Sequence, residues 1–345
     1  MGALMEKQSI SEFKKFIEMQ CEQIQHDVGS EQEKVFDWIN KNGKDYRERF
    51  EKSLCKNCTC WESCGYNLLT KCKFYAEDIS MYSGRRDILK RAYEVGLLVK
   101  SSYIKTKHGI DEWPFSIQSS IHIEHKGTDS ELVWFISDFN GKNTLYIIYP
   151  GTQTLKDAFT DALFFRSRNP AYANNSKVRN HWGFLNRGYL PIRKMKFELI
   201  NDNINDIEVI CESGHSLGGA VSEISCVDTH YNFIRKDGSG IFARKGGSLE
   251  LIGFAAPGSG NKQFYESLHG RLSQYIRVES PWWKDIVTGV PPQYAIARKR
   301  VIEPTIETTC KHGIENYVAD LVRLIVEEKH IDILSEIKGL KFASK

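Results

Sequence analysis

Apolar positions in the first hundred residues recur at helical spacing. Two segments, 9–17 and 30–39, each open with a serine followed three residues later by a glutamate, a capping box typical of a helix N-terminus. Asn42-Gly43 then breaks the pattern. A third run over residues 88–99 gathers apolar side chains near one helix face. The pattern predicts a helical, cysteine-containing N-terminal region over residues 1–105.

The pattern changes after about residue 113, where short β-rich runs appear with helical segments between several of them. Strands that alternate with helices favour a mixed, mostly parallel central sheet flanked by helices. The β-rich runs cover residues 116–124, 132–137, 145–149, 208–211, 249–254 and 275–278. We therefore expect an α/β fold over residues 106–345. An amphipathic helical run follows at 317–325.

Charge and composition narrow the class of protein. The 345 residues carry 47 basic and 44 acidic side chains, a formal net charge of +3, which is too balanced to suggest nucleic acid as a partner. No stretch of about 18 apolar residues exists, and the N-terminus lacks the apolar run of a signal peptide. We expect a cytoplasmic protein, or one exported by a route without a cleaved signal.

A serine with flanking glycines lies between a predicted strand and a predicted helix. The segment Gly214-His215-Ser216-Leu217-Gly218 follows the β-rich run at 208–211, which is the context that a nucleophile elbow requires. The glycines leave room for a crowded backbone, and the helix start supplies amide donors and the positive end of a dipole. A chance glycine- and serine-rich turn is the alternative. His215 is too close to Ser216 to serve as its base and is expected to be a buried histidine that points away.

Five segments together resemble the class 3 lipases. In chain order these are Tyr149-Pro-Gly-Thr-Gln-Thr-Leu-Lys-Asp-Ala-Phe-Thr-Asp161, His181-Trp-Gly-Phe-Leu-Asn-Arg-Gly-Tyr189, Gly214-His-Ser-Leu-Gly-Gly-Ala220, Gly253-Phe-Ala-Ala-Pro-Gly-Ser-Gly-Asn261 and Asp285-Ile-Val-Thr-Gly-Val-Pro-Pro292. The resemblance implies an α/β-hydrolase fold and hydrolysis of lipid esters by a serine nucleophile. Pro150 departs from the family pattern, which has arginine there, and this leaves the support of the oxyanion loop in doubt.

A catalytic triad in this fold follows the chain order serine, acid, histidine. Only His312 and His330 follow the acid segment, and His312 lies between a β-like stretch at 300–309 and a helix, where a loop rises to the top of the sheet. The resemblance and these roles favour His312 as the base and Asp285 as the orienting acid for Ser216. The alternatives are a helix-capping role for Asp285 and Asp228 as the acid.

The resemblance also assigns the oxyanion hole. The backbone N–H groups of Leu217 and Thr152 are expected to meet the oxyanion, with the Thr152 hydroxyl supported by Asp161. Residues 154–165 carry an apolar stripe at helical spacing, where the family has its mobile lid, and an ordinary packed helix is the alternative. No cofactor is expected to be required for catalysis.

The expected partner is a lipid ester at a membrane or lipid surface, with peripheral membrane contact. Basic side chains near the predicted mouth favour phospholipase A1 activity over triacylglycerol hydrolysis; they are Arg166, Arg168, Lys177 and Arg179. A lipase-like binding module without catalysis is one rival interpretation, and an acyltransferase with the same triad is another.

Five of the nine cysteines lie within 18 residues: Cys55, Cys58, Cys60, Cys64 and Cys72. Four thiolates could hold a structural zinc ion, although the spacing does not match two C-x₂-C pairs and no histidine is near. Disulfides would require an oxidising compartment, and a set of free thiols is the third interpretation. The sequence leaves these three open.

Overall fold

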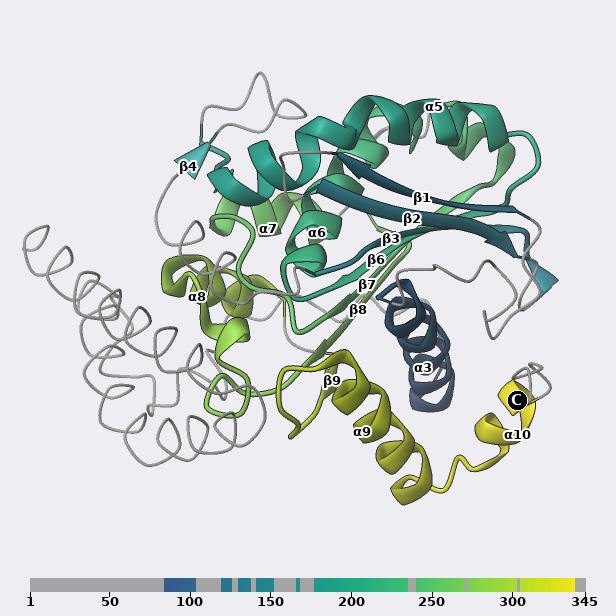
Figure 1. Ribbon diagram of the computed structural model, residues 1–345, viewed down its shortest axis with the longest axis vertical. Coiled ribbons are helices and arrows are strands. Elements are labelled where there is room, and N and C mark those ends of the chain that lie inside the picture. The colour runs from purple at the N-terminus through teal and green to yellow at the C-terminus, as the bar shows by residue number, and fades with distance from the viewer. Residues whose placement is uncertain are drawn as a thin grey trace, which may run out of the picture.

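A central sheet with helices on both faces forms the framework of the protein (Figure 1). The computed structural model describes residues 84–103, 119–125, 130–137, 141–151, 166–167, 177–234, 240–269, 272–302 and 305–338. The seven strands are β1 (Ser119–His125), β2 (Ser130–Ser137), β3 (Thr144–Tyr149), β6 (Val209–His215), β7 (Ser248–Phe254), β8 (Gln274–Glu279) and β9 (Ile306–Glu307).

The strand order is β1-β2-β3-β6-β7-β8-β9, and the sheet is mixed. The pairs β1–β2 and β2–β3 are antiparallel, whereas each later pair is parallel. All seven residues of β6 are buried, as expected for a central strand covered on both faces. The sheet and its flanking helices confirm the predicted fold class, the α/β-hydrolase fold.

Two hydrophobic cores lie on opposite faces of this sheet, because side chains alternate along each strand. On β3, for example, Leu145 and Ile147 belong to one core, and Tyr146 and Ile148 belong to the other. The first core is covered by α5 (Arg193–Asn203), α6 (Leu217–Thr229), α7 (Lys262–His269) and α8 (Pro292–Val301). The second is covered by α3 (Arg85–Ser102), α9 (Ile314–Glu327) and α10 (Asp332–Lys338).

The described residues also form several shorter elements. A two-stranded sheet joins β4 (Arg166–Ser167) to β5 (Asn180–His181). The short helices of π or 3₁₀ type are η4 (Phe184–Tyr189), η5 (Leu190–Ile192), η6 (His230–Ile234), η7 (Ala243–Lys245) and η8 (Ile286–Gly289). Among the described residues, no helix combines the length and the apolar character needed to span a bilayer.

Helix α3 is part of the α/β core, which corrects the predicted domain boundary at residue 105. Its side chains Leu89, Ala92 and Val95 are fully buried in the core that also contains Tyr317 and Leu321 of α9. Figure 1 shows α3 beside α9, beneath the sheet. Local periodicity identified the helix but carried no information about its packing partner. The α/β domain therefore includes residues from Arg85 onward.

The β-like stretch expected at residues 300–309 is mostly not a strand. Helix α8 continues through Val301, and β9 is limited to Ile306–Glu307. Tyr294, Ala297 and Val301 of α8 are buried, so packing on the sheet favours a helix where β-branched residues alone favoured a strand. The loop that follows β9 still leads to His312 and α9, as expected.

Candidate active site

Ser216 occupies a sharp bend between the end of β6 and the start of α6. Its backbone has φ 59° and ψ −131°, a region that non-glycine residues rarely adopt. A Cβ atom at Gly218 would overlap the carbonyl oxygen of Tyr149, and one at Gly214 would overlap the backbone of Gly218. The flanking glycines are therefore required by contact between backbones, as a nucleophile elbow demands.

The structure brings Ser216, His312 and Asp285 into one hydrogen-bonded chain. His312 Nε2 lies 2.9 Å from Ser216 Oγ, and His312 Nδ1 lies 2.8 Å from Asp285 Oδ2. The Asp285 carboxylate accepts from Nδ1–H, which leaves Nε2 as the acceptor of the serine proton. The three side chains come from loops after β6, β8 and β9, and parallel strands bring their C-terminal ends to one edge of the sheet.

Three donors fix the orientation of the fully buried Asp285 carboxylate. Besides His312, the Tyr317 hydroxyl donates to Oδ2 at 2.7 Å and the Val287 backbone N–H donates to Oδ1 at 3.0 Å. The second bond caps η8, so Asp285 has the capping role considered from the sequence in addition to its contact with His312. Burial, together with the nearby Asp285 charge, raises the pKa of Tyr317 well above its ordinary value, so this phenol remains a donor.

A buried arginine supports the segment that carries Asp285. Arg298 of α8 donates to the carbonyl oxygens of Pro257 at 3.0 Å and Thr288 at 3.4 Å. It also forms ion pairs with Glu279 at 3.3 Å and Glu223 at 3.5 Å, and its side chain is fully buried. The fixed fork of the guanidinium thus joins β8, the loop after β7 and η8.

His215 is buried as expected, but it does not point away from the site. Its ring lies 4.7 Å from the His312 ring, at an interplanar angle of 30°. Burial, with a smaller contribution from His312, lowers the pKa of His215 well below its ordinary value. His215 is therefore neutral beside the ring of His312. The prediction that His215 points away was wrong. Its position next to Ser216 in the sequence indicated that His215 could not be the base, but it did not indicate which side chain the His215 ring would contact.

The two rival residues lie elsewhere. Asp228 of α6 accepts from the Tyr189 hydroxyl at 2.6 Å and pairs with Arg193, on the opposite face of the sheet from α9. His330 follows the C-terminal end of α9, and its backbone N–H donates to the Ile325 carbonyl at 2.8 Å. The Ser216–His312–Asp285 chain includes neither residue.

Several predicted positions lie outside the described residues. Among the oxyanion-hole residues, Leu217 is described and is the first residue of α6, whereas Thr152 and Asp161 are not described. The lid segment at 154–165 and the cysteine cluster at 55–72 are also outside this part of the chain. The three described cysteines, Cys211, Cys226 and Cys310, are free thiols. The oxyanion-loop, lid and zinc assignments stay predictions.

Sequence reasoning missed two tyrosines at this site. Tyr317 was recognised only as an apolar position of an amphipathic helix, and Tyr103 was not singled out at all. The Tyr103 hydroxyl contacts both Gly151 and His215, at 2.8 Å each. A tyrosine at helical spacing is indistinguishable from a core residue until its hydroxyl has a partner, so no local signal could have found either one.

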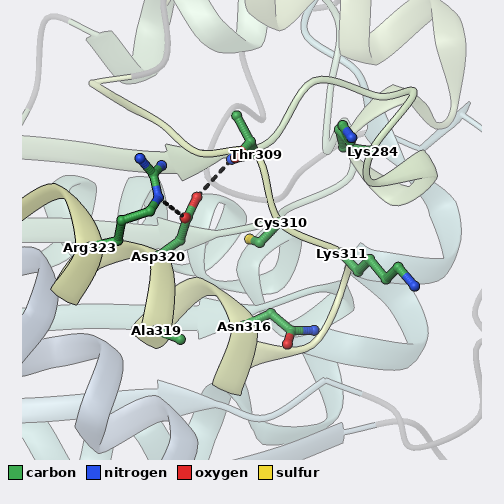
Figure 2. A pocket seen from close by; sticks show the side chains of 8 residues that line it. All are labelled: Lys284, Thr309, Cys310, Lys311, Asn316, Ala319, Asp320 and Arg323. Carbon is green, nitrogen blue, oxygen red and sulfur yellow. Dashed lines mark hydrogen bonds and ion pairs between the residues drawn. The ribbon is translucent and has the colours of Figure 1, made fainter.

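A depression of about 440 Å³ lies beside the loop that leads to His312. Figure 2 shows its lining residues, which are Lys284, Thr309, Cys310, Lys311, Asn316, Ala319, Asp320 and Arg323. Asp320 accepts from the Thr309 backbone N–H at 2.7 Å and pairs with Arg323 at 2.6 Å. Lys284 and Lys311 directly precede Asp285 and His312 in the chain, so this depression is basic and adjoins both loops.

The sheet topology and the serine-centred elbow define this protein as an α/β-hydrolase fold with a Ser-His-Asp arrangement at the edge of its sheet. Residues 146–295 match the family model "Lipase (class 3)". This match confirms the resemblance to the class 3 lipases over that segment of the chain.

Known lipases resemble the chain over part of its length. The lipases of Rhizopus niveus and Rhizopus oryzae are each 27% identical over 191 residues, which is 52% of this chain and 44% of the relative. The chain thus spans less than half the length of these curated relatives.

Solved structures of fungal lipases are also similar. Lipase II from Rhizopus niveus has 20% identity and a TM-score of 0.49, over 61% of this chain and 78% of that chain. A triacylglycerol lipase from Penicillium expansum has 18% identity and a TM-score of 0.47, over 58% of this chain and 72% of that chain.

Proposed function

We propose that this protein is a serine hydrolase that cleaves carboxylic esters of lipids through an acyl-enzyme on Ser216. The observation that carries the proposal is the continuous chain from Ser216 Oγ through the His312 ring to Asp285, with distances of 2.9 and 2.8 Å. A strained serine at a helix start, a ring nitrogen beside its hydroxyl and a buried acid beside the other ring nitrogen are the parts that acyl transfer requires. The class 3 lipase match at residues 146–295 supports the same chemistry.

Each side chain has one role in the proposed reaction. As Ser216 Oγ forms a bond to the ester carbonyl carbon, its proton passes to His312 Nε2, and Asp285 stabilises the resulting imidazolium. Collapse of the tetrahedral intermediate breaks the ester C–O bond, and His312 returns the proton to the leaving alcohol. Water then attacks the acyl-enzyme with His312 as base, which releases the carboxylic acid and restores the Ser216 hydroxyl.

The oxyanion hole is assigned by its position beside the nucleophile. Leu217 begins the helix that Ser216 precedes, so its backbone N–H belongs to the positive end of the α6 dipole. Thr152, with Asp161 as its support, is proposed as the second donor from the family resemblance. Each such donor is typically worth about 10²–10³ in kcat.

Labelling and turnover test this assignment. We expect Ser216→Ala to abolish hydrolysis of p-nitrophenyl butyrate and to lose labelling by a fluorophosphonate probe. The matched control is Ser222→Ala on α6, a buried serine whose hydroxyl donates to the Gly219 carbonyl, and it should retain both. Turnover that persists in Ser216→Ala would contradict the proposal. A wild type that the probe does not label would favour a binding module without catalysis.

Within the lipase class, we favour a phospholipase A1 over a triacylglycerol lipase. Basic side chains support this preference: Lys284 and Lys311 are exposed beside the loops that carry Asp285 and His312, and Lys177 is exposed at the start of the segment that leads to β5. A phosphate-bearing headgroup would gain from such charges when it approaches from an anionic or zwitterionic surface.

Product analysis tests the substrate class. Phosphatidylcholine vesicles should release free fatty acid and the lysophospholipid that retains its sn-2 chain, faster than trioleoylglycerol emulsions release fatty acid. The Lys284→Gln/Lys311→Gln variant should lose activity on vesicles while keeping its activity on soluble p-nitrophenyl butyrate. Faster hydrolysis of trioleoylglycerol by the wild type would favour a triacylglycerol lipase instead.

A further inference from the structure

Tyr103 connects the loop after β3 with the ring that packs on His312. It follows the last turn of α3, outside residues 146–295, and its hydroxyl contacts the backbone of Gly151. That N–H donates to Tyr103 Oη at 2.8 Å, and Oη lies 2.8 Å from His215 Nδ1. One phenol oxygen therefore touches both the residue before Thr152 and the residue before Ser216.

The direction of each hydrogen bond follows from the protonation of these groups. Burial raises the pKa of Tyr103 well above its ordinary value, so the phenol keeps its proton. Gly151 N–H can only donate, so among the contacts of Oη within the described residues His215 Nδ1 is the acceptor of the phenol proton. His215 is neutral, since burial lowers its pKa, and its ring proton is therefore on Nε2. This nitrogen is buried without a hydrogen-bond partner among the described residues.

The contact at Gly151 depends on the absence of a side chain. A Cβ atom at Gly151 would overlap Tyr103 Oη, and it would lie 2.7 Å from the His215 carbonyl oxygen and 3.0 Å from Ser216 Cβ. The loop after β3, Tyr103 and the elbow thus approach one another as closely as their backbones allow. A displacement of the phenol would be transmitted to both neighbours, because packed interiors leave no free volume.

His215 links Tyr103 to the proposed base. The His215 ring lies edge-on to the Tyr103 ring, with centroids 5.8 Å apart, and faces the His312 ring at 4.7 Å. When His312 accepts the Ser216 proton it becomes a cation, and the neutral ring of His215 presents an aromatic surface to that charge. The Tyr103 hydroxyl stabilises this neutral form by donating to Nδ1, and it fixes which ring nitrogen bears the proton.

We propose that Tyr103 is a positioning residue that couples the oxyanion loop at Gly151 to the general base His312 through His215. The proposal rests on the hydrolase function assigned above. It places the residue that caps α3 in the active-site support, so the C-terminal end of this helix contributes to the reaction as well as to the core. Anchoring of α3 on the sheet is the competing role, and it predicts a loss of stability without a change in turnover per active serine.

Tyr103→Phe removes one hydroxyl and keeps the ring. We expect kcat for p-nitrophenyl butyrate, normalised to fluorophosphonate-titrated active sites, to fall roughly tenfold while KM stays within about twofold, since remote positioning acts on the transition state. Tyr93→Phe is the matched control: Tyr93 lies on α3, the helix that Tyr103 follows, is half-buried and packs on the same core, and the variant should keep kcat within about twofold.

A double-mutant cycle tests the path through His215. If Tyr103 acts through that ring, Tyr103→Phe should change kcat far less in a His215→Asn background than in the wild type. Additive effects on kcat, or a normal kcat per titrated site in Tyr103→Phe, would overturn the coupling. Failure of the hydrolase proposal has a different signature, because the wild type would then show no labelling at Ser216.

Discussion

The serine elbow and the acid segment are both held rigidly, but by different forces. At Ser216 the constraint is steric, because Gly214 and Gly218 are in backbone contact with each other and with Tyr149. Around Asp285 the constraint is electrostatic, since buried donors and ion pairs fix the carboxylate and its loop. The elbow is thus sensitive to added volume, whereas the acid segment is sensitive to lost polar partners. This difference decides which substitutions damage each region.

The largest effect is expected from an added methyl group at the elbow. Gly218→Ala places a Cβ atom in steric overlap with the Tyr149 carbonyl oxygen, so the backbone of the elbow has to move apart. We expect loss of soluble protein or of all fluorophosphonate labelling. Gly253→Ala is the control, because a Cβ at this buried strand position meets no atom within 4 Å. An active Gly218→Ala enzyme with normal labelling would show that the constraint is not steric.

An acid-dependent loss of stability is expected from the polar network of the acid segment. Burial alone would raise the pKa of Glu279, but Arg277, Arg298 and Lys299 outweigh it and lower this pKa to about 2. The folded-state pKa is thus below the ordinary value of 4.5, so this stabilisation is complete above pH 4.5 and is lost as the pH falls toward 2. The shift corresponds to roughly 3 kcal/mol at neutral pH.

Chemical denaturation at a series of pH values between 5 and about 2.5 measures this contribution. In Glu279→Gln the free energy of unfolding should be lower at pH 5 and should fall less steeply on acidification than in the wild type. The same slope in both proteins would mean that other carboxylates, and not this network, account for the acid sensitivity.

The smallest effect is expected from a single hydroxyl at Asp285. Tyr317→Phe removes the donor at 2.7 Å and leaves His312 and the Val287 N–H in place. We expect kcat to fall by roughly threefold to tenfold with little change in KM, because one of three orienting bonds is lost. A matched loss in Tyr93→Phe, a half-buried tyrosine that packs on the same core, would instead point to a general weakening of the core.

The sequence by itself determined the central features of this protein. The alternation of β-rich and helical runs predicted the sheet, and glycines around a serine predicted the elbow, because both depend on contacts between near neighbours in the chain. The resemblance to the class 3 lipases, with the order serine, acid, histidine, then favoured Asp285 and His312. In the structure His312 lies in hydrogen-bonding distance of both Asp285 and Ser216.

Only the tertiary structure decided how distant segments meet. The hydroxyl contacts of Tyr103 and Tyr317 and the facing rings of His215 and His312 join residues that are between 32 and 112 positions apart in the chain. The packing of α3 on the sheet likewise joins segments that are distant in sequence. Periodicity reports whether a side chain is inside or outside, since it reflects burial. It does not report which buried polar atom another will meet, because that depends on the three-dimensional course of the whole chain.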